Sequence, residues 1–211
     1  MAHRLAPSVP ALRPKELVPP RVVYLVSTNV HKYLEAREVV ASYNLSLAFL
    51  RDDVPELQHS DVVEIAKWGA RWAADKWDLP VLVEDTGLFI QALGGFPGPY
   101  ASYVLRTIGL TGVLKLLDGV EDRRAYFKTA LAFCDGREAE PVVFTGEAWG
   151  QIALEARGAG GFGYDPIFVP DGGDGRTFAE MSREEKNALS HRGKAFRAFS
   201  EWFRSYRGLT A

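Results

Sequence analysis

The chain contains very little cysteine and no long apolar run, and each absence excludes a class of protein. Cys134 is the only cysteine in 211 residues, so an internal disulfide and a cage of cysteine thiolates around a metal are both excluded. No stretch of about 20 apolar residues is present, which a membrane-spanning helix would require. The first 20 residues also lack the apolar segment of a secretory signal. We therefore expect a cytoplasmic protein with no membrane partner.

An excess of positive charge is also missing. The chain has 25 Lys and Arg residues against 27 Asp and Glu residues, a formal net charge of −2. Proteins that hold a nucleic-acid backbone present a positive field to its phosphates. A nucleic-acid polymer is therefore not expected as a partner.

Prolines divide the chain into two parts. Five of the 12 prolines fall within the first 20 residues, which predicts an irregular, Pro-rich N-terminal arm over residues 1–20. Residues 21–207 have the length of one domain or one compact two-lobed unit, and we expect a single domain there.

Predicted strands and helices alternate along this domain. Short β-branched and aromatic runs predict strands at residues 22–26, 45–50, 81–83, 126–134, 142–151 and 165–169. Apolar residues at helical spacing predict helices at residues 32–42, 61–77 with Ser60 as N-cap, 100–108 and 111–117. A last helix follows the capping box of Ser182 and Glu185 and buries Phe196, Phe199 and Phe203. This alternation indicates an α/β fold with a mixed sheet.

The first strand-to-helix junction has the composition of a phosphate site. Residues 27–32 read Ser-Thr-Asn-Val-His-Lys, which places hydroxyls, an amide and an ammonium where helix N–H groups are free. The flanking glycines of a Walker A loop are missing, so that motif is excluded. The alternative is an ordinary helix N-cap followed by a surface lysine.

Two acids, Glu84 and Asp85, follow the apolar run of residues 81–83. Carboxylate oxygens at the carboxyl end of a strand suit Mg²⁺. Because neighbouring strand residues face opposite sides, only one of the two can point into a given cleft. Glu56, before the next predicted helix, could supply a partner carboxylate, and Lys67 lies on that helix. The alternative is a pair of solvated acids opening a loop.

Two later segments have competing interpretations. Residues 158–163 match the pattern GxGxxG, but a strand rather than a helix is predicted to follow, so a dinucleotide fingerprint is rejected. Phe162 in this segment could stack on a planar base, or pack as a core residue beside a turn. Residues 185–192 concentrate Lys186, His191 and Arg192, which could form a binding surface or a solvated helix face.

The order of these motifs resembles that of the inosine triphosphate pyrophosphatase family, also called the Ham1 family. The resemblance rests on residues 27–32, 83–87, 95–100 (Gly-Phe-Pro-Gly-Pro-Tyr), 162–166 (Phe-Gly-Tyr-Asp-Pro) and 185–192, and it extends over residues 22–203. It implies an elongated, two-lobed α/β fold with a central mixed sheet flanked by helices, a cleft between the lobes, and a homodimer. It also implies Mg²⁺-dependent hydrolysis of non-standard purine nucleoside triphosphates such as ITP, dITP and XTP to the monophosphate and pyrophosphate.

The resemblance further implies roles for individual residues. Asp85 and Lys32 would be catalytic, and Glu56 and Asp85 would bind Mg²⁺. The substrate-binding residues would be Ser27, Thr28, Asn29, Val30, His31, Lys32, Lys67, Thr86, Phe162, Gly163, Tyr164, Asp165, Lys186, Ser190, His191 and Arg192. Among these, Phe162 would stack on the purine. One position departs from the family pattern, because Thr28 stands where members often have glycine.

Two rival functions remain open from the sequence. One is a pyrophosphatase for pyrimidine or modified nucleotides, as in the Maf family, which has a similar fold. The other is a non-catalytic nucleotide-binding module that uses the same basic and aromatic residues. The acid pair Glu56 and Asp85 argues against the second, because binding alone does not require carboxylates beside phosphates.

Overall fold

The structure, a computed structural model, describes residues 12–209, which form one mixed β-sheet with helices on both faces. Its strands are β1 (Val22–Val26), β2 (Ser46–Leu50), β3 (Pro80–Ile90), β4 (Pro97–Gly98), β5 (Arg124–Asp135), β6 (Val142–Ile152) and β7 (Phe168–Pro170). Its α-helices are α1 (Val30–Ala41), α2 (Val62–Trp77), α3 (Ala101–Thr107), α4 (Gly109–Leu116), α5 (Arg183–Leu189) and α6 (His191–Tyr206). Short 3₁₀ turns are η1 (Pro14–Leu17), η2 (Gln91–Leu93), η3 (Asp165–Ile167) and η4 (Phe178–Glu180).

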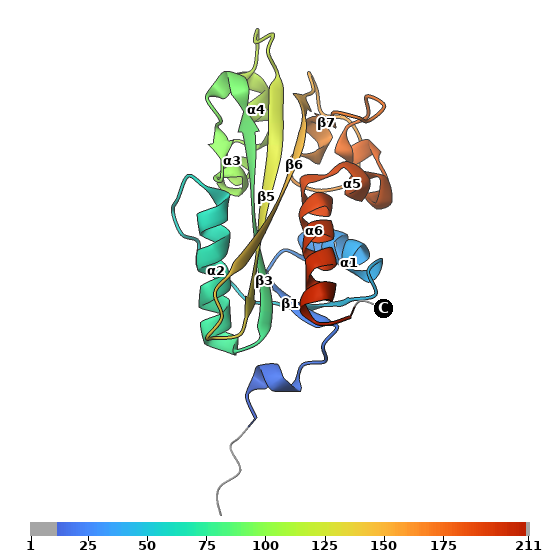
Figure 1. Ribbon diagram of the computed structural model, residues 1–211. Coiled ribbons are helices and arrows are strands. Elements are labelled where there is room, and N and C mark those ends of the chain that lie inside the picture. The colour runs from blue at the N-terminus through green and yellow to red at the C-terminus, as the bar shows by residue number, and fades with distance from the viewer. Residues whose placement is uncertain (1–11, 210–211) are drawn as a thin grey trace, which may run out of the picture.

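The sheet combines a parallel and an antiparallel part. Strand order is β2-β1-β3-β5-β6-β7, with β4 beside β3. The pairs β2–β1 and β1–β3 are parallel, and all the others are antiparallel. Figure 1 shows β3, β5 and β6 running along most of an elongated molecule, with α2 on one side and α1 and α6 on the other. The predicted α/β class with a mixed sheet is confirmed, and the strands predicted at residues 126–134 and 142–151 pair as the antiparallel hairpin of β5 and β6.

Two lobes share this sheet. In the first lobe, α2 covers one face through Ala66, Ala70 and Ala73, which pack on β3 and β5. On the opposite face, Phe196, Phe199 and Phe203 of α6 are fully buried, as predicted. Each such side chain stabilises the fold by about 1.5–3 kcal/mol relative to exposure. In the second lobe, α3, α4, η4 and β7 enclose a separate core around the other end of β3, β5 and β6.

Strand β3 is longer than predicted, and this changes the position of the two acids. The sequence prediction ended the strand at Val83, whereas β3 continues to Ile90. Each of its 11 residues has a partner on β5, from Pro80 with Asp135 to Ile90 with Ala125. This long-range pairing overrides the low strand preference of Glu84, Asp85 and Gly87. Glu84 and Asp85 therefore lie inside a strand and not at its carboxyl end.

Two other local predictions were wrong. The N-cap of α2 is Asp61 and not Ser60, because the Asp61 carboxylate accepts a hydrogen bond from the backbone N–H of Val63. The strand predicted at residues 165–169 begins as the turn η3, and only β7 pairs with β6. The glycine-rich segment before η3 is thus followed by a turn and a strand, which agrees with rejecting a dinucleotide fingerprint. Within residues 12–209, no helix has both the length and the apolar character that crossing a membrane requires.

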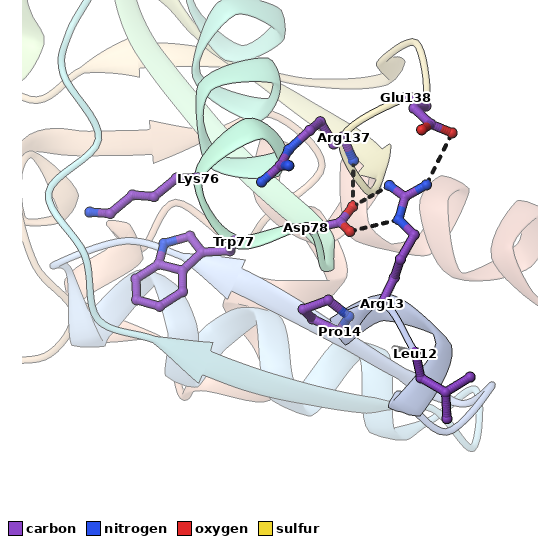
Figure 2. A pocket seen from close by; sticks show the side chains of 8 residues that line it. All are labelled: Leu12, Arg13, Pro14, Lys76, Trp77, Asp78, Arg137 and Glu138. Atoms are coloured by element: carbon purple, nitrogen blue, oxygen red, sulfur yellow. Dashed lines mark hydrogen bonds and ion pairs between the residues drawn. The ribbon is translucent and has the colours of Figure 1, made fainter. Parts of the chain in front are cut away.

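The N-terminal segment is not irregular throughout, because part of it is attached to the first lobe. Residues 1–11 of the expected arm lie outside the described residues. Arg13, just before η1, donates hydrogen bonds of 2.8 and 2.7 Å to the carboxylate of Asp78 and pairs with Glu138. Figure 2 shows these residues lining a pocket of about 510 Å³ between the segment, the end of α2 and the β5–β6 loop. Most of its charged groups are paired with one another, so it offers little free charge to a ligand.

Replacing Asp78 by asparagine is expected to destabilise the fold by about 1–3 kcal/mol, because charged hydrogen bonds are lost at a buried acceptor. Asp78 ends α2 in a left-handed conformation and also accepts from the backbone N–H of Arg137. Asparagine tolerates that conformation, so the substitution tests the loss of the negative charge without a change in the backbone. Hydrogen bonds from Arg13 and from that N–H hold the pKa of Asp78 well below its usual range. Its stabilisation is therefore present above about pH 4 and is lost as pH falls.

Urea unfolding of the wild type, Asp78→Asn and the control Asp174→Asn, which alters an exposed loop residue, measures this effect. The difference between wild type and Asp78→Asn should be clear at pH 7 and should shrink below pH 4. Equal midpoints at pH 7 would show that the N-terminal attachment contributes no stability.

Candidate active site

The site residues gather at a gap in the sheet beside the middle of β3. Strand β1 pairs with β3 only at Val81 and Leu82, and β4 pairs with it only at Leu88 and Phe89. Between these pairs, that edge of β3 has no strand partner in the described residues 12–209. The first turn of α1 fills the gap, where the Lys32 ammonium contacts the backbone carbonyl of Glu84 at 3.4 Å.

The junction between β1 and α1 forms as predicted. Asn29 is the N-cap of α1, and its side-chain oxygen accepts from the N–H groups of His31 and Lys32. The Ser27 hydroxyl accepts from the N–H of Asn29, while Thr28 and Val30 are exposed. In this state the N-cap itself occupies two of the N–H groups that a phosphate would use. A bound anion would have to share or displace these bonds.

Glu84 and Asp85 point to opposite faces of β3, as strand alternation requires. Glu84 lies opposite Leu131, in the core under α1 and α6, and Asp85 lies opposite Ala130, in the core under α2. Lys32 at the edge influences both, because it pairs with the Glu84 carboxylate at 3.5 Å and its charge lowers the pKa of Asp85. The site therefore has two sides that meet at Lys32.

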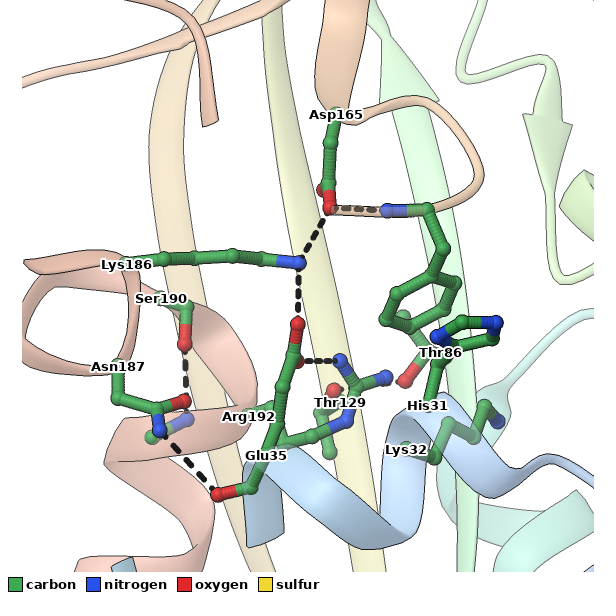
Figure 3. Close-up of polar contacts among 12 residues, drawn as sticks. His31, Lys32, Glu35, Thr86, Thr129, Asp165, Lys186, Asn187, Ser190 and Arg192 are labelled. Atoms are coloured by element: carbon green, nitrogen blue, oxygen red, sulfur yellow. Dashed lines mark hydrogen bonds and ion pairs between the residues drawn. The ribbon is translucent and has the colours of Figure 1, made fainter. Parts of the chain in front are cut away.

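On the Glu84 side, a buried arginine joins two acids. Arg192 at the start of α6 donates through Nε and Nη2 to the Glu84 carboxylate, at 2.9 and 2.8 Å. Through Nη1 it donates to Glu35 at 2.6 Å. Figure 3 shows Glu35 on α1 between Arg192 and Lys186. Only 2% of the Arg192 side chain is exposed, so its carboxylate partners offset a large desolvation cost.

A second buried cation extends the network. Lys186 on α5 donates to Glu35 at 2.6 Å and to Asp165 at 2.5 Å. Burial opposes ionisation of Glu35 and Glu84, but the cations outweigh it and hold the pKa of each below its usual range. For Asp165 burial prevails over the Lys186 charge, so its pKa is raised. Lys32, Lys186 and Arg192 thus face Glu35, Glu84 and Asp165 in an almost neutral cluster.

Phe162 lies among these cations. Its ring centroid is 4.7 Å from the Lys186 ammonium and 5.4 Å from the Arg192 guanidinium carbon. The Phe162 ring also stacks on the imidazole ring of His31, with 5.3 Å between the two ring centroids. The Phe162 N–H donates to Asp165, and a Cβ on Gly161 would lie 2.1 Å from the same carboxylate, so this turn requires glycine there. Phe162 is therefore a half-buried aromatic platform and not a core residue.

Three other predicted residues support the site from within the structure. Ser190 is the N-cap of α6 and accepts from the N–H of Gly193. His191 is buried and stacks on Phe127 at 4.5 Å; burial, reinforced by Arg192 and Lys186, lowers its pKa well below the usual range. Tyr164 donates its hydroxyl to the carbonyl of Ala101, and burial raises its pKa to about 12. The Tyr164 side chain thus belongs to the core of the second lobe and does not face Phe162.

The Asp85 side has the character of a cation site. Oδ2 of Asp85 is buried and has no hydrogen-bond partner among the described residues. Burial, together with the negative charges of Glu84 and Glu56, raises the pKa of Asp85 to about 6, although the Lys32 charge opposes this. A buried carboxylate oxygen without a hydrogen-bond partner suits a hard divalent cation, and Glu56 is close enough for its charge to affect Asp85. Lys67 on α2 is partly exposed and pairs with Glu64 at 3.0 Å, so it is not committed to Asp85.

The structure adds residues that the sequence prediction missed. Glu35 joins both buried cations, Asn187 donates to the Glu35 carbonyl, and Thr129 bonds to Thr86. One signal could have indicated Glu35: it follows Lys32 by three residues and His31 by four, hence lies on their side of α1. Thr129 and Asn187 had no comparable signal.

These two sides suit different parts of one ligand. Phe162 and the buried cations can hold a planar, oxygen-bearing ring, because aromatic faces stack and guanidinium N–H groups donate to oxygen. The Asp85 side and the α1 terminus can hold polyanionic groups together with a metal. Because the two sides meet at Lys32, its ammonium would lie between the ring and the polyanionic part of such a ligand.

Comparison with known proteins identifies the family of the chain. A profile of the Ham1 family matches residues 23–202. The dITP/XTP pyrophosphatase of Methanopyrus kandleri is 50% identical over 185 residues, covering 87% of this chain and 96% of that protein. That of Pyrococcus horikoshii is 47% identical over 183 residues, covering 86% and 96%.

Solved structures give the same result for the fold. A HAM1 protein from Coxiella burnetii has a TM-score of 0.75 at 34% identity, covering 87% of this chain and 98% of that one. The Staphylococcus aureus Ham1 protein has a TM-score of 0.74 at 27% identity, covering 88% and 99%. Since one family profile spans most of the chain and these relatives match along nearly their whole length, the chain belongs to the Ham1 family.

Proposed function

We propose that the protein hydrolyses non-standard purine nucleoside triphosphates, namely ITP, dITP and XTP, to the monophosphate and pyrophosphate, and so cleanses the nucleotide pool. The observation that carries this proposal is the two-sided site on β3. Phe162 forms a base platform on one side, and on the other Oδ2 of Asp85 is buried with no hydrogen-bond partner among residues 12–209. It occurs in a chain about half identical to proteins named dITP/XTP pyrophosphatase.

The Asp85 side and the start of α1 would hold the triphosphate and Mg²⁺. A nucleoside triphosphate carries about four negative charges that must be neutralised before water can attack phosphorus. The buried cations near Glu84 are already paired with acids, which leaves little positive charge for the phosphates. Glu56 and Asp85 would bind Mg²⁺, which supplies charge neutralisation and polarises phosphoryl oxygens. Ser27, Thr28, Asn29, Lys32 and Lys67 would contact the phosphates.

Asp85 is also the group best suited to orient the attacking water and accept its proton. In the metal-free protein a pKa of about 6 leaves the carboxylate mostly ionised at neutral pH, and a bound Mg²⁺ would favour the ionised form further. The ionised carboxylate is the form that can orient water and accept its proton. Lys32, which stands between Asp85 and the ring side, would stabilise the charge that develops on the phosphate oxygens.

The Glu84 side would select the base. Phe162 would stack on the purine, while Arg192 would donate to the 6-oxo group that hypoxanthine and xanthine carry and adenine lacks. A guanidinium has five N–H donors. Three of those on Arg192 are used by Glu84 and Glu35, which leaves one each on Nη1 and Nη2. Adenine presents a donor at this position, so its complex would leave these N–H groups unpaired.

Removing divalent metal is expected to abolish activity, and Mg²⁺ is expected to restore it. Glu56→Gln should raise the Mg²⁺ concentration for half-maximal activity by about 10-fold or more, as losses around metal ligands commonly do. The control is Glu64→Gln, which removes a nearby exposed acid paired with Lys67 and should leave the metal requirement unchanged. Full activity in excess chelator would refute the metal assignment.

We also propose that the protein acts as a homodimer in the cytoplasm, as the family resemblance implies. Light scattering coupled to gel filtration tests the first part. The rival functions are separated by one assay, in which ITP, XTP, dITP, GTP, ATP, CTP and UTP are incubated with Mg²⁺ and products are resolved chromatographically. Monophosphate formed mainly from ITP, dITP and XTP supports the proposal. Preference for a pyrimidine nucleotide would favour the Maf-like alternative, and unchanged nucleotide the binding module.

A further inference from the structure

A pair of threonines, Thr129 fully buried and Thr86 partly buried, lies beneath the Glu84 side of the site. Thr86 on β3 and Thr129 on β5 are direct partners in the sheet, and their hydroxyl oxygens are 2.7 Å apart. Thr86 also donates to the Glu84 carboxylate at 2.8 Å. Thr129 is 0% exposed and, being under the network, contacts no ligand-facing surface. Figure 3 shows both threonines close to Arg192.

The hydrogen bonds that join Thr129, Thr86 and Glu84 can have only one donor-to-acceptor direction. Each threonine hydroxyl has a single proton to donate. Glu84 accepts two hydrogen bonds from Arg192 and is a carboxylate, so it can only accept. Thr86 therefore gives its proton to Glu84, and Thr129 must donate to Thr86. The sequence of donors ends on the same carboxylate oxygen that Nη2 of Arg192 contacts.

Packing alone does not explain a threonine at position 129. The neighbours on the same face of β5, Phe127 and Leu131, are buried and apolar. Valine has nearly the same shape and would fill the space without placing a hydroxyl in the core, where an unpaired one is costly. The hydroxyl matters for the network, because among the described residues the Glu84 carboxylate is otherwise held only by two long side chains from other elements, Arg192 and Lys32. Thr86, fixed by Thr129, ties that carboxylate to the rigid centre of the sheet.

We propose that Thr129 is a positioning residue for purine recognition, which acts through Thr86 and Glu84 to fix the plane of the Arg192 guanidinium. The inference rests on the proposed function, in which Arg192 donates to the 6-oxo group. It adds a residue from β5 that does not itself touch the substrate. The effect is expected to be specific to the base, because Asp85, the proposed metal ligand and base, lies on the other face of β3.

Steady-state hydrolysis of ITP and ATP by the wild type, Thr129→Val and Thr129→Ser tests this role. Loss of one hydrogen bond in the network should lower kcat/KM for ITP by about 3- to 10-fold in Thr129→Val, mainly through KM. ATP, whose base has an amino donor in place of the 6-oxo acceptor, should be hardly affected, so the ITP/ATP ratio falls by the same factor. Thr129→Ser keeps the hydroxyl and should retain the wild-type ratio. Unfolding in urea should show Thr129→Val to be at least as stable as Thr129→Ser.

The outcomes separate this inference from the proposed function. Wild-type hydrolysis of ITP with an unchanged ITP/ATP ratio in Thr129→Val would overturn the inference and leave the function standing. Equal losses on ITP and ATP would assign Thr129 a merely structural role and also overturn it. Wild-type protein that leaves ITP intact would overturn both. If Thr129→Val does not fold, Thr129→Ser and Thr129→Ala, which differ only in the hydroxyl, provide the same comparison.

Discussion

Replacing Asp85 by asparagine is expected to lower kcat for ITP by about 10²- to 10⁴-fold, the usual contribution of a general base. Asparagine keeps the shape of the side chain but can neither accept the proton of the attacking water nor supply a second negative charge to Mg²⁺. Turnover of ITP at saturating Mg²⁺ measures the effect. Glu155→Gln, which alters an exposed acid on a loop, serves as the control.

The same substitution is expected to stabilise the metal-free protein. The folded pKa of Asp85 is raised to about 6, so burial disfavours the ionised form. This destabilisation appears as pH rises from the ordinary pKa of about 4 toward 6 and is complete above it. At pH 7 without metal, the free energy of unfolding of Asp85→Asn should therefore be about 1–3 kcal/mol higher than that of the wild type. The variant should accordingly unfold at a higher urea concentration. Near-normal turnover combined with unchanged stability would refute both the catalytic and the electrostatic assignment.

Replacing Arg192 by methionine is expected to lower the free energy of unfolding by about 3–5 kcal/mol, because it breaks a buried ion pair and leaves its acids behind. Glu35 would keep Lys186 as a partner, whereas Glu84 would keep only Lys32, at 3.5 Å, and Thr86. Most of the cost should thus come from Glu84. The double variant Arg192→Met/Glu84→Gln should recover part of the stability, since it removes the uncompensated charge.

The matched control for this experiment is Arg183→Met. Arg183 also pairs with an acid of α1, Glu38, but both side chains are more than 40% exposed. Exposed pairs typically contribute less than about 1 kcal/mol. Urea unfolding of the three variants at pH 7 compares them directly. A small loss for Arg192→Met, equal to that of Arg183→Met, would mean that the buried network does not hold this part of the fold together.

Local patterns in the sequence predicted much of the fold. The apolar spacing of Phe196, Phe199 and Phe203 gave the buried face of α6 correctly, because helix periodicity is a local property. The length of β3 could not be predicted in this way. Glu84, Asp85 and Gly87 have low strand preference, and their conformation follows from pairing with residues of β5 that are more than 40 positions away.

The site was predictable in part for the same reason. Alternation along β3 indicated that Glu84 and Asp85 would face different sides, and the structure places them in different cores. Partners could not be deduced, because the Lys186–Glu35 bond joins residues 151 positions apart. Tyr164 shows the opposite limit: it follows Phe162 by two residues in the same motif, yet its side chain lies in the core of the second lobe. Adjacency in a motif therefore does not establish a common orientation.

Hydrolysis of ITP in ¹⁸O-labelled water, with mass analysis of both products, tests the central claim most directly. In the proposed reaction, water oriented by Asp85 attacks the α-phosphorus and pyrophosphate leaves. The label should therefore appear in the monophosphate, with unlabelled pyrophosphate formed in equal amount. Label in pyrophosphate, or release of inorganic phosphate with a diphosphate product, would contradict the account, because water would then have attacked a different phosphorus.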